Sequence, residues 1–227
     1  MRMTWSELLF AHWAVDPELV EIHLPDGLTL DTHEGKAWVG VVPFLMSDVA
    51  PRGFPAIPRL SRFLELNVRT YVVKDGKPGV WFFSLDAANP IAVRAARTTF
   101  SLPYMDADMS LAEDKGSSTI QYDSNRTHRA EPPASFSARY RSSGESFHAS
   151  PGTLEHWLTA RYCLYSANKK GAVYRGEIDH PPWPLQEATC EIQENTMGNP
   201  LRFDFSGTPH LLFAKLIRVH AWWATMC

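Results

Sequence analysis

The segment from Glu65 to Asp86, ELNVRTYVVKDGKPGVWFFSLD, constrains the fold more than any other part of this 227-residue sequence. Its first half alternates polar and apolar residues, a period of two that is typical of a β-strand with two unlike faces. Asp75-Gly76 follows, and this dipeptide favours a two-residue hairpin turn because a type I′ turn needs positive φ at both positions. The sequence therefore predicts an antiparallel β-hairpin.

A two-residue turn at Asp75-Gly76 fixes which residues of the two strands face each other. The polar face is predicted to pair Arg69 with Phe82, Asn67 with Ser84, and Glu65 with Asp86. The apolar face is predicted to pair Thr70 with Trp81, Val68 with Phe83, and Leu66 with Leu85. A shift of register would change these pairs but not the alternation within each strand.

The polar face of this hairpin has two interpretations. It could face water, as one side of an antiparallel sheet commonly does. It could instead line a polar cavity, which the aromatic residues Tyr71 and Phe82 on the same face favour. Two facing carboxylates at Glu65 and Asp86 would repel and raise the pKa of one, and Arg69 could offset that repulsion. Such a set could perform acid–base catalysis, bind a polar ligand, or form a purely structural ion-pair network.

Composition excludes several classes of protein. The formal net charge of −3 gives no electrostatic reason to expect binding to nucleic acid or to an anionic membrane. No run of 18 apolar residues predicts a membrane span, and the N-terminus lacks the pattern of a signal peptide. The three widely spaced cysteines argue against a disulfide framework. We expect a single domain over residues 1–227, located in the cytoplasm.

The rest of the chain predicts more strands than helices. Helices are expected from Asp16-Pro17-Glu18, over 91–100 after Asn89-Pro90, and after Pro151-Gly152-Thr153. Strands outside the hairpin are expected over 36–42, 118–123, 135–141, 172–178, 188–193 and 211–222, and residues 43–58 read as a long irregular stretch. About eight strands and three short helices predict an α+β protein, mainly antiparallel β, built as a closed or half-closed barrel with helices packed around it.

Other candidate residues lie outside the hairpin. The histidines show no metal-ligand spacing, so we expect no metal site and no cofactor. Lys169-Lys170 could lower each other's pKa, but ANKKGA reads as a turn with two solvated lysines. Arg94 and Arg97 share one flank of the second helix, and Arg97 is predicted to turn inward onto Glu65 or Asp86. Both could instead be solvated.

The motifs of this chain resemble a known family. ELNVRTYV, GVWFFSLDA, SLPYMDADM, LPDGL, WVGVVPF, TARYCLYS and HPPWPLQ together resemble the uncharacterised bacterial YqjF-like family, over nearly the whole chain. That family is grouped by fold with acetoacetate decarboxylase, so the resemblance implies a mainly antiparallel barrel that encloses a cavity. The decarboxylase forms a Schiff base through a Lys-Lys pair, and the corresponding segment here, Asn89 to Tyr104, contains Arg94 and Arg97 but no lysine. Since arginine stays protonated, we expect no Schiff-base chemistry.

Three functions stay open. The chain could be a small-molecule enzyme with catalytic residues Glu65, Arg69 and Asp86, a noncatalytic binding protein for a small polar or anionic metabolite, or a structural protein with a buried ion-pair network. The residues expected to contact a ligand are Asn67, Tyr71, Ser84, Arg97, Tyr104, Arg161 and Tyr165. Arg161 and Tyr165 share strand parity and so could face the same cavity. The expected partner is a small molecule, and a homo-oligomer is left open.

Overall fold

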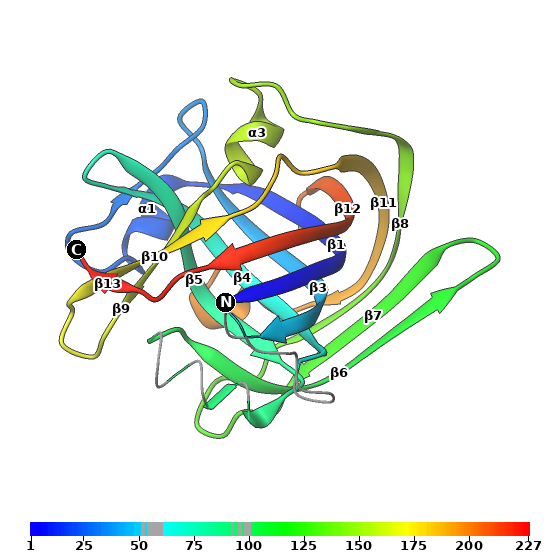
Figure 1. Cartoon of the computed structure of the whole chain (residues 1–227), viewed down its shortest axis with the longest axis horizontal. Coiled ribbons are helices and arrows are strands. Elements are labelled where there is room, and N and C mark those ends of the chain that lie inside the picture. Colours follow the sequence, from blue (N-terminus) through cyan, green and yellow to red (C-terminus); the bar gives the residue numbers. More distant parts are fainter. Residues whose placement is uncertain (51–52, 54–60, 92, 95–96, 98–100) are drawn as a thin grey trace.

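The structure is a computed structural model that describes residues 1–50, 53, 61–91, 93–94, 97 and 101–227. It is built almost entirely from β-strands (Figure 1). The strands are β1 (Arg2–Val15), β2 (Thr29–Leu30), β3 (Ala37–Ala50), β4 (Phe63–Lys74), β5 (Lys77–Ala87), β6 (Tyr104–Asp114), β7 (Thr119–Arg126), β8 (Ser135–Phe147), β9 (Cys163–Ala167), β10 (Val173–Asp179), β11 (Leu185–Asn195), β12 (His210–Ala221) and β13 (Thr225–Met226). The mainly antiparallel α+β class predicted from the sequence is confirmed.

Strand pairing runs in a cycle. The order β5-β6-β7-β8-β11-β12-β1-β3-β4 returns to its start because β4 also pairs with β5. β9 and β10 join a second path between β5 and β12. All pairings are antiparallel except those of β5 with β6 and with β9. The closed or half-closed barrel and the single domain over residues 1–227 stay predictions.

The helices are short. α1 (Pro17–Glu21) begins after Asp16, and α3 (Leu154–Thr159) begins after Thr153, whose hydroxyl accepts a hydrogen bond from the backbone N–H of His156. A 3₁₀ helix spans Asn199–Leu201. Both α-helix starts were predicted. Of the helix expected over 91–100, residues 91, 93, 94 and 97 are helical and the others lie outside the described residues.

The sequence underestimated the strands. The described residues form 13 strands rather than about eight, and β1 and β6 were not anticipated. The stretch 43–58, read as irregular, begins inside β3, which continues to Ala50. Pro43 is accommodated there opposite Leu66. Pro51, Pro55 and Pro58 lie outside the described residues.

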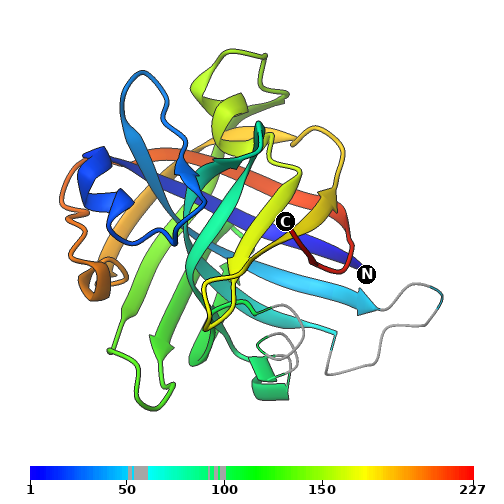
Figure 2. The same cartoon turned by 90° about the vertical axis from the view of Figure 1, so that its left-hand side faces the viewer.

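The core lies on both faces of the sheet. One cluster draws side chains from β1, β3, β4, β7, β8 and β12, among them Leu9, Val68 and Phe136. A second cluster lies on the other face and includes Phe10, Phe44 and Trp183. α3 lies at the upper end of the sheet in Figures 1 and 2, where Leu158 packs against Tyr71.

Candidate functional site

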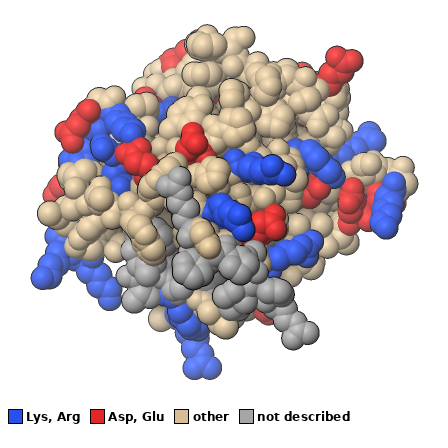
Figure 3. Space-filling view, in the orientation of Figure 1, with Lys and Arg blue, Asp and Glu red and all other residues tan. Residues whose placement is uncertain are grey.

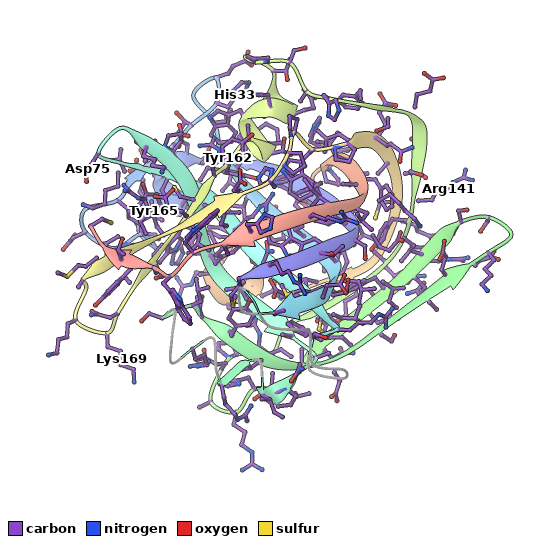
Figure 4. The ribbon with its side chains drawn as sticks, in the orientation of Figure 1. His33, Asp75, Arg141, Tyr162, Tyr165 and Lys169 are labelled. Carbon is purple, nitrogen blue, oxygen red and sulfur yellow. The ribbon has the colours of Figure 1, made fainter. Side chains whose placement is uncertain are left out.

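The β4–β5 hairpin forms as predicted around its turn. Asp75 and Gly76 have φ values of 52° and 73°, and Figure 4 shows Asp75 at the tip of the hairpin. Pairing follows the prediction from Lys74 opposite Lys77 as far as Arg69 opposite Phe82. The positive φ angles match the turn type that Asp-Gly favours.

Beyond Arg69 the predicted pairs are wrong. A β-bulge leaves Phe83 without a partner on β4, so Ser84 pairs with Val68 and Asp86 with Leu66. A shift of one residue moves side chains to the other face of the sheet. The prediction that Ser84 and Asp86 share a face with Glu65 is therefore wrong.

One face of β4 carries a row of buried polar residues, which we call the β4 row: Glu65, Asn67, Arg69 and Tyr71. They alternate along the strand and so point the same way. None is more than 9% exposed. The row faces the protein interior rather than water.

Glu65 is held by a tyrosine from β6. The Tyr104 hydroxyl donates a hydrogen bond to Glu65 Oε2 at 2.8 Å. Burial raises the pKa of Glu65 from 4.5 to about 8, although the hydrogen bond from Tyr104 lowers it. A buried carboxyl with a pKa near neutrality can exchange a proton under physiological conditions, which is what general acid–base catalysis requires.

Tyr71 lies between a histidine and two guanidiniums. Its hydroxyl is 2.7 Å from His12 Nε2, and both side chains are fully buried. The guanidinium carbon of Arg69 lies 5.7 Å from the Tyr71 ring centre, and that of Arg161 lies 4.9 Å from it. Burial, and then the charge of Arg69, lowers the pKa of His12 well below 6.5, so this imidazole is neutral.

The two arginines differ in their counter-ions. Arg161 forms an ion pair with Asp31 at 2.6 Å. Arg69 lies over the Phe10 ring at 5.3 Å, and no carboxylate among the described residues forms an ion pair with it. With His12 neutral and Asp31 offsetting Arg161, this region keeps one positive charge in excess. A buried cation without a counter-ion is unfavourable and favours the binding of an anion.

Several polar atoms of this region have no hydrogen-bond partner among the described residues. They are Asn67 Oδ1, Arg69 Nε, Arg161 Nη2 and His12 Nδ1. Two of them belong to the β4 row, two residues apart on one face. Buried polar atoms in folded proteins are nearly always paired, so an unpaired set marks a place where a ligand or water can bind.

Asp86 belongs to a different cluster, on the opposite face. Arg126 donates to both oxygens of Asp86, at 2.9 and 3.1 Å, and to Ser84 Oγ at 3.1 Å. We call these three residues the Asp86 cluster. The side chains of Arg126 and Asp86 are 3% and 0% exposed. Burial raises the pKa of Asp86, and the hydrogen bonds from Arg126 oppose that shift. The cluster reads as an internally paired structural unit.

The predicted inward orientation of Arg97 is wrong. Arg97 is exposed, and it donates to the Tyr104 carbonyl and contacts His128 Nε2 at 3.1 Å. Arg94 is also exposed and forms an ion pair with Asp106 at 2.9 Å. Both arginines are therefore exposed, the arrangement that the sequence left as the alternative.

Arg161 and Tyr165 do not face one cavity. Arg161 packs on Tyr71, whereas Tyr165 clusters with Val72, the next residue of β4 and so on its other face. The Tyr165 hydroxyl donates to the Lys77 carbonyl at 2.9 Å. The prediction from strand parity was wrong because Arg161 precedes β9 and is not part of that strand.

None of the seven lysines is buried, and all seven are described. Lys169 and Lys170 lie exposed in the turn between β9 and β10, as their sequence context indicated. Within the described ranges, no group of three or more His, Cys, Asp or Glu side chains could hold a metal ion. None of the helices there is long and apolar enough to span a membrane.

Two residues of these clusters were missed in the sequence. His12 lies on β1, a strand that was not anticipated, opposite Gly40, where an added Cβ would lie 2.6 Å from His12 Nε2. Arg126 shares the parity of the buried Tyr122 and Ser124 on β7. That alternation could have predicted that Arg126 points inward. It could not have predicted the contact with Asp86, which lies 40 residues earlier in the chain.

Comparison with known proteins agrees with this fold. The chain belongs to the DUF2071 family of uncharacterized conserved proteins, whose sequence profile matches residues 2–218. It is 45% identical over 197 residues to the uncharacterized protein YqjF of Bacillus subtilis (strain 168), covering 87% of this chain and 79% of YqjF. The family resemblance predicted from the motifs is confirmed.

Solved structures show the same fold at low identity. Acetoacetate decarboxylase from Legionella pneumophila superposes with a TM-score of 0.64 at 12% identity, covering 100% of this chain and 86% of the enzyme. The enduracididine biosynthesis enzyme MppR, complexed with pyruvate, gives 0.66 at 10% identity, covering 99% and 89%. An acetoacetate decarboxylase-like enzyme from Sphingomonas wittichii RW1 gives 0.61 at 11% identity, covering 100% and 92%.

Proposed function

We propose that this protein is a small-molecule enzyme that binds a small carboxylate beside the β4 row and transfers a proton through Glu65. The observation that carries the proposal is the set of buried, unpaired polar atoms on and around the β4 row. Arg69, which lacks a counter-ion, would bind the carboxylate in the geometry that a guanidinium favours. The β4 row faces away from the Val68 cluster, toward Phe10 and His12 of β1 and toward Arg161, so we place this site on that side of β4.

Glu65 is the proton-transfer group in this proposal. It lies four residues from Arg69 on the same face, about 13 Å along the strand. A pKa of about 8 keeps it protonated at neutral pH, with Tyr104 fixing its orientation. A ligand whose carboxylate contacts Arg69 would extend past Asn67 toward this acid. Asp86, counted among the catalytic candidates from the sequence, is assigned no role here because Arg126 already pairs it.

The fold neighbours support the class of ligand. MppR binds pyruvate, a small 2-oxo acid, in the same fold. The absence of a buried lysine among the seven supports chemistry without a Schiff base. The unpaired polar atoms around the β4 row also favour a second candidate, a noncatalytic binding protein for a small anionic metabolite. The cytoplasmic location and any homo-oligomer stay predictions.

Calorimetric titration with pyruvate and with acetoacetate tests the binding step. One of them should bind the wild-type protein, and Arg69→Gln should weaken binding about 10- to 100-fold by removing a charged hydrogen bond. Arg94→Gln, an equal loss of charge on the surface, is the matched control and should bind normally. Equal binding by Arg69→Gln and wild type, or no binding by either acid, would contradict the proposal.

Proton exchange separates the enzyme from the binding protein. With pyruvate in D₂O at a pD near 8, where part of Glu65 is ionised and can accept a methyl proton, the wild type should accelerate loss of the methyl proton signal, and Glu65→Gln should abolish this while still binding. Binding without exchange in the wild type would favour the noncatalytic candidate. Borohydride treatment with either acid should trap no lysine adduct.

A further inference from the structure

A groove of about 860 Å³ lies on the surface, beside the middle of β5 and the end of β9. Its lining includes three consecutive aromatic residues, Trp81, Phe82 and Phe83, each only partly buried. Such a volume is within the range of small-molecule sites, roughly 300–1,000 Å³. The groove is separate from the Asp86 cluster and the β4 row, none of whose residues lines it.

Trp81 and Phe83 lie on the groove side of β5, where they pack beside Tyr165 and Phe203. Strand alternation turns the Phe82 side chain to the other face, beside Tyr71 and Leu158. Phe83 is the residue that the β4 pairing skips, and its ring meets Phe203 at 5.4 Å and His23 at 6.2 Å, edge to face. The bulge therefore lies directly beside the groove, and bulges are frequent beside functional sites.

The charge in the groove has one sign. Arg97, Lys169 and Lys170 line it, and no acidic residue is among the described residues of its lining, in a chain whose net charge is −3. Neither lysine forms an ion pair with a carboxylate in the described part of the chain. Figures 3 and 4 show basic side chains projecting at the lower left of the molecule, where Lys169 is labelled below Tyr165.

The turn that presents the two lysines is held by side-chain hydrogen bonds. Asn168 Oδ1 accepts from the backbone N–H of Lys170 at 2.9 Å and from that of Ala172 at 3.1 Å. Gly171 takes the positive φ of 81° that closes the turn. The lysines are therefore placed by a fixed loop, and an Asn side chain that bonds its own turn is typical of such loops.

We propose that this groove is a second binding site, for a small molecule that joins a flat aromatic body to a negatively charged group. Trp81 and Phe83 offer rings for edge-to-face or offset packing with the aromatic body. Lys169, Lys170 and Arg97 attract the anion at the rim. The Lys169-Lys170 pair, exposed in its turn, thereby gains a role in binding.

Titration with naphthalene-2-sulfonate, followed by calorimetry and by amide chemical shifts, tests the groove. Binding should shift the amides of residues 81–83 and 168–171. Lys169→Glu/Lys170→Glu should weaken binding about tenfold, from the sum of two exposed charge interactions. The control Lys36→Glu/Lys115→Glu carries the same change in net charge on exposed lysines elsewhere and should stay within about twofold of wild type. Equal affinity of the two double variants would overturn the proposal.

Two simpler probes separate the two parts of the proposed ligand. Methanesulfonate, which has the charge alone, and 2-naphthalenemethanol, which has the rings alone, should each bind at least about tenfold more weakly than naphthalene-2-sulfonate. Either one binding as tightly would overturn the combined recognition. Arg69→Gln and Glu65→Gln should leave this binding unchanged, so failure of the interior site and failure of the groove can be told apart.

Discussion

The two faces of the β4–β5 hairpin each bury charged groups, but only one face pairs them fully. In the Asp86 cluster, Arg126 meets both carboxylate oxygens and Ser84. In the β4 row, Asn67 and Arg69 keep polar atoms without partners in the described residues. A buried cluster whose polar atoms are all paired needs no further hydrogen-bond partner. Buried polar atoms without partners lower the stability of the folded protein. The comparison supports a structural role for the Asp86 cluster and the proposed ligand binding at the β4 row.

The largest effect should come from breaking the Asp86 cluster. Arg126→Met leaves Asp86 buried without a counter-ion and should lower the free energy of unfolding by about 3–5 kcal/mol in denaturant melts. Arg175→Met, which removes an ion pair with Glu177 at the surface, should cost no more than about 1 kcal/mol.

A double variant sharpens this first prediction. Asp86→Leu/Arg126→Met removes both charges and should recover much of the loss, because no unpaired charge stays buried. Pyruvate or acetoacetate binding should survive in it. If binding were lost in a double variant that folds normally, the division between the two clusters would be wrong.

The second prediction concerns the pH dependence that Glu65 imposes. Since its folded pKa of about 8 lies above the ordinary 4.5, the folded protein holds this proton more tightly than the unfolded chain. The resulting stability is fully present below pH 4.5 and is lost as the pH rises through 8. Between pH 5 and pH 8 the wild type should lose on the order of 3 kcal/mol relative to Glu65→Gln.

The comparison with Glu65→Gln is needed because His12 titrates in the opposite sense. Its pKa is lowered in the folded protein, so its contribution is lost as the pH falls below 6.5. His12 is present in both proteins and cancels in the difference. A difference that stays constant from pH 5 to pH 8 would show that Glu65 is already ionised, and would remove it as the proton-transfer group.

The hairpin illustrates how far the sequence could predict this site. Asp75-Gly76 specifies its own turn, and pairing follows from it as far as Arg69 and Phe82. The bulge at Phe83 has no local signal, because WFFSLD contains neither the glycine nor the proline that often marks one. Because Phe83 has no partner on β4, Asp86 lies on the other face of the sheet. The predicted cluster of Glu65, Arg69 and Asp86 therefore does not form.

The hydrogen-bond partners of Glu65 and Asp86 could not be predicted from the hairpin sequence, for a different reason. Tyr104 and Arg126 meet Glu65 and Asp86 from 39 and 40 residues away, through the pairing of β5, β6 and β7. A parity argument can place a side chain on a face, but it cannot say which strand supplies its partner. The family resemblance predicted the fold, and the chemistry of the site depends on these long-range contacts.

The smallest expected effect belongs to Arg97, which the sequence had placed in the interior. Its guanidinium touches the Tyr104 carbonyl and His128, outside both clusters. Arg97→Ala and Arg94→Ala should therefore each cost no more than about 1 kcal/mol in denaturant melts, because both side chains are exposed. The carboxyl carbon of Glu65, followed by NMR against pH, should titrate at the same pKa in Arg97→Ala as in the wild type. A shifted Glu65 pKa would mean that the backbone at Tyr104 passes the loss of Arg97 to the tyrosine hydroxyl, and would couple the β4 row to this exposed arginine.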